Sequence, residues 1–286
     1  MSELTHTIRE KSQELLAAGR VDGVLYLVRD RFDVVQPWLI FRAEEIGSIE
    51  TSPKWNLAKL ALQTIRQAGP SFRLAVVCRG CDERALLELA KRNQVDATRI
   101  TVLGYTCSRE QAESCLCVRP YPEKPLAGEK IEGVDPFADP HVSALLTGDE
   151  GKRMARWAGL LSRCIKCYGC RNACPICVCA PCKLEDDLWV ERAVVPTELI
   201  PYHLIRAFHL SDTCVACGAC QDACPVGIPV LTLQLLMRRR LQERYAYEAG
   251  LEADRKSPLL MDFDHASPAG FELPAWTVSS EAPHER

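Results

Sequence analysis

Residues 164–175 read CIKCYGCRNACP, and residues 214–225 read CVACGACQDACP. In both copies the cysteines follow the spacing C-x2-C-x2-C-x3-C-P. In such a run three closely spaced thiolates bind one [4Fe-4S] cube, and the fourth cysteine binds a second cube. The spacing therefore predicts two cubes that exchange their fourth ligands. Cluster A is expected to use Cys164, Cys167, Cys170 and Cys224, and cluster B is expected to use Cys214, Cys217, Cys220 and Cys174.

A pair of zinc sites is the alternative interpretation of these two runs. Zinc needs only four thiolates in two C-x2-C pairs, which leaves the third and fourth cysteines of each run without a role. Two complete copies therefore favour iron–sulfur chemistry. The spacer between the runs, residues 175–213, is longer than a minimal ferredoxin needs and contains a predicted helix. This half resembles the α-helical ferredoxin domain of succinate dehydrogenase and heterodisulfide reductase subunits.

Three more cysteines follow the first run within a few residues. Thiolates so close together in sequence could bind a third cube if one ligand came from elsewhere in the chain. The alternative is that they are small buried residues that bind nothing. The three residues are Cys177, Cys179 and Cys182.

The first half of the chain carries five cysteines of its own. Cys78 and Cys81 form a C-x-x-C pair where a predicted strand meets a predicted helix, a position that suits a redox dithiol. Open α/β sheets also bind ligands at the carboxyl ends of their strands, and a further cube at this edge is the favoured alternative. The sixteen cysteines set a maximum of four cubes, and the two runs set a minimum of two. The candidate ligands at the sheet edge are Cys78, Cys81, Cys107, Cys115 and Cys117.

Short apolar runs in the first half alternate with segments of helical periodicity. Residues 24–28, 74–78 and 100–103 are predicted strands, and residues 57–68 and 82–92 are predicted helices. This alternating order favours an α/β domain with a mainly parallel sheet. The cysteine-rich second half is predicted to be a mostly α-helical, two-cluster ferredoxin domain.

We expect four parts along the chain. Residues 1–118 form the α/β domain, and residues 141–257 form the ferredoxin-type domain. Residues 119–140 are rich in proline, glycine and charge, and are expected to join the two as a linker or long surface loop. Residues 258–286 show little periodicity and are expected to be flexible or to clasp a partner.

The composition narrows the class of protein. The chain has 286 residues, of which 47% are hydrophobic, and a formal net charge of -3. This balance argues against a nucleic acid or an anionic membrane surface as the main partner, because both require clustered lysine and arginine. No apolar run reaches the length of a membrane span, and the N-terminus lacks the apolar core of a signal peptide. We therefore expect a cytoplasmic location, where thiols stay reduced and dense cysteine indicates metal or redox chemistry.

Several segments of the first half share one resemblance. They are VDGVL at 21–25, LAVV at 74–77, Cys81-Asp82, ELAK at 88–91, and VLG at 102–104 with Cys107. These segments, within roughly residues 20–110, resemble one known family, the beta subunits of hydrogenases and formate dehydrogenases that reduce a deazaflavin coenzyme (F-420). The second half, with RCIKC at 163–167 and NACP at 172–175, looks like the ferredoxin region joined to this module in bacterial relatives.

In that family the beta subunit can carry FAD and pass electrons between a diffusible carrier and iron–sulfur clusters. The resemblance therefore implies an electron-transfer role. Cys81 and Cys107 match family cysteines, which implies a cluster at the sheet edge. The family's Gly-Gly segment ahead of the first strand and its later Gly-rich, flavin-contacting stretch have no counterpart here. FAD is accordingly an alternative cofactor without an assigned site.

The favoured function is an iron–sulfur electron-transfer subunit of a multi-subunit oxidoreductase. Its expected partners are a formate dehydrogenase or hydrogenase-like catalytic subunit and, on the other side, a heterodisulfide-reductase-like subunit or a ferredoxin. The sequence contains no G-x-G-x-x-G, H-E-x-x-H or G-x-S-x-G motif, so no catalytic residue is assigned, and His203 and His209 are interpreted as surface or packing residues. Two alternatives stay open. One is an FAD-containing subunit that itself oxidises or reduces a deazaflavin or similar carrier, and the other is a dithiol–disulfide enzyme that uses Cys78 and Cys81.

Overall fold

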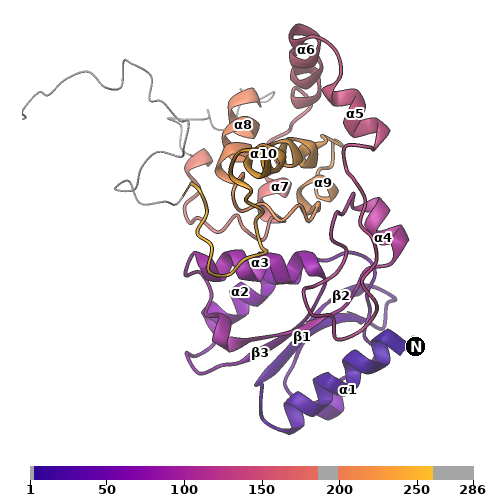
Figure 1. Ribbon diagram of the computed structural model, residues 1–286. Coiled ribbons are helices and arrows are strands. Elements are labelled where there is room, and N and C mark those ends of the chain that lie inside the picture. The colour runs from indigo at the N-terminus through magenta and orange to yellow at the C-terminus, as the bar shows by residue number, and fades with distance from the viewer. Residues whose placement is uncertain (1–2, 186–198, 260–286) are drawn as a thin grey trace, which may run out of the picture.

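The computed structural model describes residues 3–185 and 199–259. Figure 1 shows a sheet with helices on both faces in the N-terminal half, and a helical region that lies over one of those helical layers. This arrangement confirms the predicted fold class, an α/β domain with a mainly parallel sheet followed by a mostly helical ferredoxin domain.

Four strands form one sheet in the order β2-β1-β3-β4. β1 (Gly23–Arg29), β3 (Leu74–Cys78) and β4 (Ile100–Gly104) run parallel and match the predicted strands, while β2 (Val35–Ile40) pairs antiparallel with β1 at the edge. No apolar run in the sequence predicts β2. Pro37 interrupts the apolar run of this strand, and proline is tolerated in sheets mainly at an edge, where a missing N–H costs no ladder hydrogen bond.

Side chains of the strands alternate between two apolar cores. On one face Tyr26 packs in the core that α1 (Glu3–Ala17) covers. On the other face Leu25 packs in the core formed with α2 (Leu57–Gln67) and α3 (Gly80–Lys91), two helices that the sequence predicts within a few residues. Three residues of the cysteine-rich half complete this second core, so the two halves share buried apolar surface. They are Ile176, Leu210 and Val215.

The second half of the described chain is helical, as predicted. α8 (Leu199–His209) lies in the spacer between the two cysteine runs, where the sequence predicts a helix, and α10 (Val230–Tyr245) follows the second run. The remaining helices are α4 (Arg109–Ser114), α5 (Pro140–Leu146), α6 (Glu150–Leu161), α7 (Gly169–Asn172) and α9 (Ala219–Asp222), with short 3-10 turns at Ala43–Glu45, Ala97–Arg99 and Lys183–Glu185.

The segment between the two halves, residues 119–139, has no helix yet is fixed along the carboxyl edge of the sheet. The N–H of Leu126 donates to the carbonyl of Gly104 over 2.8 Å, and Ala127 forms a bridge with Tyr105. Gly133 lies so close to the carbonyl of Val118 that a β-carbon would collide with it. These contacts hold the loop against the strand ends.

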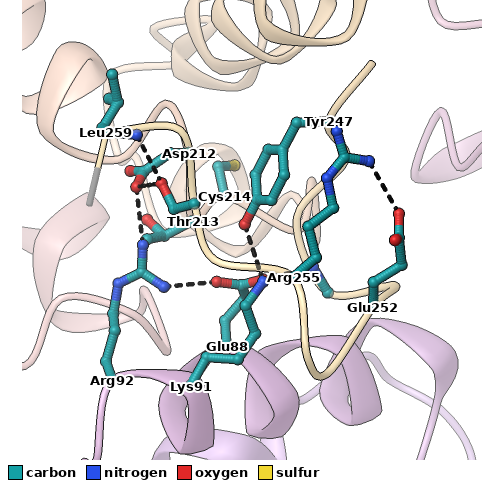
Figure 2. Close-up of polar contacts among 12 residues, drawn as sticks. Glu88, Lys91, Arg92, Asp212, Thr213, Cys214, Tyr247, Glu252, Arg255 and Leu259 are labelled. Atoms are coloured by element: carbon teal, nitrogen blue, oxygen red, sulfur yellow. Dashed lines mark hydrogen bonds and ion pairs between the residues drawn. The ribbon is translucent and has the colours of Figure 1, made fainter. Parts of the chain in front are cut away.

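A buried ionic network ties α3 to the second half, as Figure 2 shows. The carboxylate of Glu88 is fully buried and accepts hydrogen bonds from Lys91 at 2.8 Å, from Arg92 at 2.6 Å and from the N–H of Gly250 at 2.7 Å. Arg92 also pairs with Asp212 at 2.9 Å, just ahead of the second cysteine run. The α3 helix therefore anchors the ferredoxin domain by charge as well as by apolar packing.

Within the ranges 3–185 and 199–259, no helix has the length and apolar character needed to cross a membrane. The predicted tail, residues 258–286, lies almost wholly outside the described residues.

Candidate iron–sulfur sites

The two cysteine runs fold as near copies of each other. The N–H of Lys166 donates to the Cys164 sulfur over 3.4 Å, and the N–H of Ala216 donates to the Cys214 sulfur over the same distance. Lys166 and Ala216 both have positive φ, 52° and 53°, and each run continues into a short helix, α7 or α9. Backbone amides that point at cysteine sulfur stabilise the thiolate and tune a bound cluster.

A glycine lets the two runs approach each other closely. A β-carbon at Gly169 would lie 2.6 Å from the carbonyl oxygen of Ala223. The start of α7 thus packs directly on the residue before Cys224. This packing brings the fourth cysteine of the second run to the first run, as the exchanged-ligand spacing predicts.

The predicted ligands of cluster A lie together. Burial raises the pKa of the Cys164 thiol, and the neighbouring sulfurs of Cys170, Cys167 and Cys224 raise it further. All four cysteines line one cavity, next to Tyr202.

Two polar side chains in the cavity lined by the predicted cluster A ligands have unpaired atoms. His203 lines this cavity, and within the described residues neither ring nitrogen of this buried histidine has a hydrogen-bond partner. The hydroxyl of Tyr202 lies against the Cys170 thiol and has no nitrogen or oxygen partner in the described part of the chain. Buried polar atoms are rarely left unpaired unless an ion or cofactor accounts for them. The residues present therefore fit a cluster here.

The predicted ligands of cluster B also lie together. Burial raises the pKa of Cys214, with Cys174 among the sulfurs beside it. Burial raises the pKa of Cys220 to about 12, and the neighbouring sulfurs of Cys214 and Cys174 also raise it. Cys217 is half-buried and has Cys174, Cys214 and, from the α/β domain, Cys81 as its neighbours. Thiols held this close fit a group that binds them as thiolates.

Four of the five cysteines of the first half line one cavity at the carboxyl edge of the sheet. The cavity has a volume of about 430 Å³. Cys81 follows β3 in the first turn of α3, and Cys107 follows β4. Asp82 fixes this edge because its carboxylate accepts from the N–H of Leu57 at 2.7 Å, which joins the start of α2 to the start of α3. The cysteines that line the cavity are Cys81, Cys107, Cys115 and Cys117, joined by Cys217 of the second run.

Cys78 lies elsewhere. Its side chain is buried in the core between the sheet and the α2–α3 layer, and its sulfur donates to the carbonyl of Val76 at 3.4 Å. Burial raises the pKa of both Cys78 and Cys81, whereas a reactive dithiol requires a lowered thiol pKa. This geometry disfavours a dithiol enzyme that uses the pair.

The three cysteines after the first run do not meet in one place. Cys177 lies beside Cys174, and the pair shares a hydrogen bond that lowers the pKa of Cys174. Cys182 lies against Arg171, and Cys179 is exposed. A third cube on this loop stays a prediction.

Among the residues that the structure describes, no group of three or more histidine, cysteine, aspartate or glutamate side chains is placed to share one metal ion. In a [4Fe-4S] cube each thiolate binds a different iron, so the four sulfurs surround a volume and do not converge on one point.

Two cations that no sequence motif predicts face the cysteines, the half-buried Lys54 and the buried Arg206. Lys54 donates to the Cys115 sulfur at 3.6 Å and pairs with Asp222 of α9, which joins the sheet edge to the second run. Arg206 of α8 lies among sulfurs of the predicted ligands of cluster A and of cluster B, which are called set A and set B below and together the ferredoxin sets. The available signal for Arg206 is its place four residues after Tyr202, on the buried side of an amphipathic helix.

The chain is similar to a protein-family model and to known formate dehydrogenase subunits. The family model described as "4Fe-4S binding domain" matches residues 209–230. The chain is 32% identical to the F420-dependent formate dehydrogenase subunit beta of Methanocaldococcus jannaschii over 154 residues, covering 52% of this chain and 37% of the relative. It is 39% identical to the F420-dependent formate dehydrogenase 1 subunit beta of Methanococcus maripaludis over 104 residues, covering 36% of this chain and 26% of the relative. The matches thus span well under half of the relatives' length. They confirm the resemblance to this beta-subunit family and the presence of a ferredoxin-type domain.

Proposed function

We propose that this chain is the iron–sulfur electron-transfer subunit of a cytoplasmic oxidoreductase complex. It relays electrons between a formate dehydrogenase or hydrogenase-like catalytic subunit and a heterodisulfide-reductase-like partner or a ferredoxin. The observation that carries this proposal is Cys217, which belongs to the second cysteine run and also lines the cavity at the sheet edge. Cysteine sets in the two domains are therefore neighbours.

The predicted ligands of cluster A, of cluster B and of the sheet-edge cluster lie next to one another in space. Cys170 of the first set lies near Cys220 of the second, and Cys217 of the second lies near Cys81 at the sheet edge. When bound, each [4Fe-4S] cube supplies a carrier of one electron at a time. The chain's own residues would hold three such carriers in a row, from the helical domain to the α/β domain.

In this proposal the sheet edge binds a cube through four of its five cysteines. The cavity is lined by Cys81, Cys107, Cys115 and Cys117. Cys78 packs in the apolar core instead. Lys54 and Arg79 also line this cavity and place positive charge beside the thiolates. A net positive lining compensates the negative charge that four thiolates bring to a cube.

The matched variants Cys81→Ser and Cys78→Ser test this assignment. We expect Cys81→Ser to lose about four irons per chain, because it removes one ligand of a [4Fe-4S] cube, and Cys78→Ser to keep its full iron content. The complex is purified anaerobically with its native partners, iron is counted, and the reduction of the remaining clusters by formate or hydrogen is followed by electron paramagnetic resonance.

The Cys81→Ser complex should reduce fewer clusters than the Cys78→Ser complex when the same donor is supplied. If both variants keep all their iron and Cys81→Ser instead abolishes thiol–disulfide exchange, the relay assignment of the sheet edge is wrong and the dithiol enzyme is correct. FAD bound to this chain with turnover of a deazaflavin in isolation would instead support the flavin-containing alternative.

A further inference from the structure

Arg206 is a buried cation, and among the described residues it forms no ion pair with a carboxylate. Its side chain is 3% exposed. One guanidinium nitrogen donates to the carbonyl of Cys170 at 2.9 Å and lies 3.8 Å from the Cys177 sulfur. Among the described residues, its Nε has no hydrogen-bond partner. A charge buried in this way is costly unless negative charge lies beside it.

The groups that face Arg206 are the sulfurs of four cysteines, and three of these cysteines belong to the predicted ligands of cluster A or cluster B. Burial opposes its charge, but neighbouring cysteines outweigh burial and raise the pKa of Arg206. One of these cysteines, Cys170, belongs to set A, while Cys174 and Cys220 belong to set B. The cysteines that raise the pKa of Arg206, from the largest contribution to the smallest, are Cys177, Cys174, Cys170 and Cys220.

The position of α8 keeps Arg206 between the two sets. Tyr202, one turn earlier on the helix, lines the cavity of set A, and Leu210, one turn later, packs in the core beside set B. The arginine in the middle thus reaches sulfurs of both sets from a single helix. Its location differs from that of Lys54, which lies between set B and the sheet edge.

A fixed positive charge favours the form of a nearby redox centre that carries more negative charge. For an iron–sulfur cube this is the reduced form, so a buried cation beside it raises the reduction potential. The effect is strongest where water does not screen it, as around Arg206.

We propose that Arg206 is a positioning residue that raises the reduction potentials of clusters A and B together. This inference rests on the proposed function, since it requires cubes in both sets. Because one charge lies beside both clusters, its removal lowers the reduction potentials of clusters A and B together. The reduction potential of the cluster at the sheet edge stays nearly unchanged.

The test compares Arg206→Gln, Arg206→Lys and the control Arg239→Gln in the full chain, purified anaerobically and titrated by electron paramagnetic resonance at set potentials. Arg239 is an exposed arginine of α10 paired with Glu243, so its loss should move no midpoint. We expect the midpoints of both ferredoxin clusters to fall in Arg206→Gln. They should fall less in Arg206→Lys, which keeps the charge but not the fork that reaches Cys170. Iron per chain should match the unmodified protein.

Unchanged midpoints in a fully loaded Arg206→Gln protein, or a shift in one ferredoxin cluster alone, would overturn the proposal. If Arg206→Gln does not load its clusters, Arg206→Met decides, because it also removes the charge while filling the apolar space, and unshifted midpoints in the loaded Arg206→Met protein contradict the proposal equally. Absence of cubes from the unmodified protein would refute the proposed function itself, a result distinct from any of these.

Discussion

Cys220→Ser is expected to remove cluster B from the purified protein and to lower its iron content by about four atoms per chain. Cys220 is 8% exposed and lies among Cys214 and Cys174, so no solvent-borne ligand can replace its thiolate easily. The relay should be interrupted at its middle, because set B lies between set A and the sheet edge. Iron analysis and the loss of one electron paramagnetic resonance signal measure this outcome.

The control for this variant is Cys179→Ser, whose side chain is exposed and belongs to neither ferredoxin set. It should keep all iron. Loss of iron from Cys179→Ser would reveal a third cube on the loop after the first run. Full iron in Cys220→Ser would contradict the ligand assignment of cluster B.

Glu88→Ala is expected to destabilise the protein by roughly 3–5 kcal/mol, the usual cost of breaking a buried ion pair by removing one partner. Glu88 is fully buried, and its carboxylate neutralises Lys91 and Arg92 while it accepts from the N–H of Gly250. Its removal leaves Lys91 and the N–H of Gly250 without their carboxylate acceptor and leaves Arg92 with Asp212 alone. The shift of the urea unfolding midpoint under anaerobic conditions measures the effect.

Glu243→Ala is the matched control, since Glu243 pairs with Arg239 and Arg240 on the exposed face of α10. Exposed pairs of this kind contribute about 0–1 kcal/mol. Equal unfolding midpoints for the two variants would show that the Glu88 network in Figure 2 does not hold the domains together.

The sequence predicts much of this molecule because its strongest signals are local. The x2, x2, x3 spacing fixes three ligands of each ferredoxin set within one loop, and the three parallel strands appear as apolar runs. β2 escapes prediction because Pro37 interrupts its run, and its position becomes clear only from pairing with β1. Local patterns predict the structure that a segment can form without contacts to distant parts of the chain.

Other features depend on contacts between distant segments. Cys78 and Cys81 share one motif, yet Cys78 faces the core and Cys81 faces the cavity, because a strand ends and a helix begins between them. The role proposed for Arg206 has no motif at all. It follows from one helix lying between two cysteine runs, and only the packed structure reveals it.

Iron per chain, counted together with zinc and flavin after anaerobic purification with native partners, is the most direct test of a relay that extends through both domains. The account predicts about twelve irons, for the two ferredoxin cubes and one at the sheet edge, with little zinc. About eight irons or fewer, or zinc in stoichiometric amount, would contradict it.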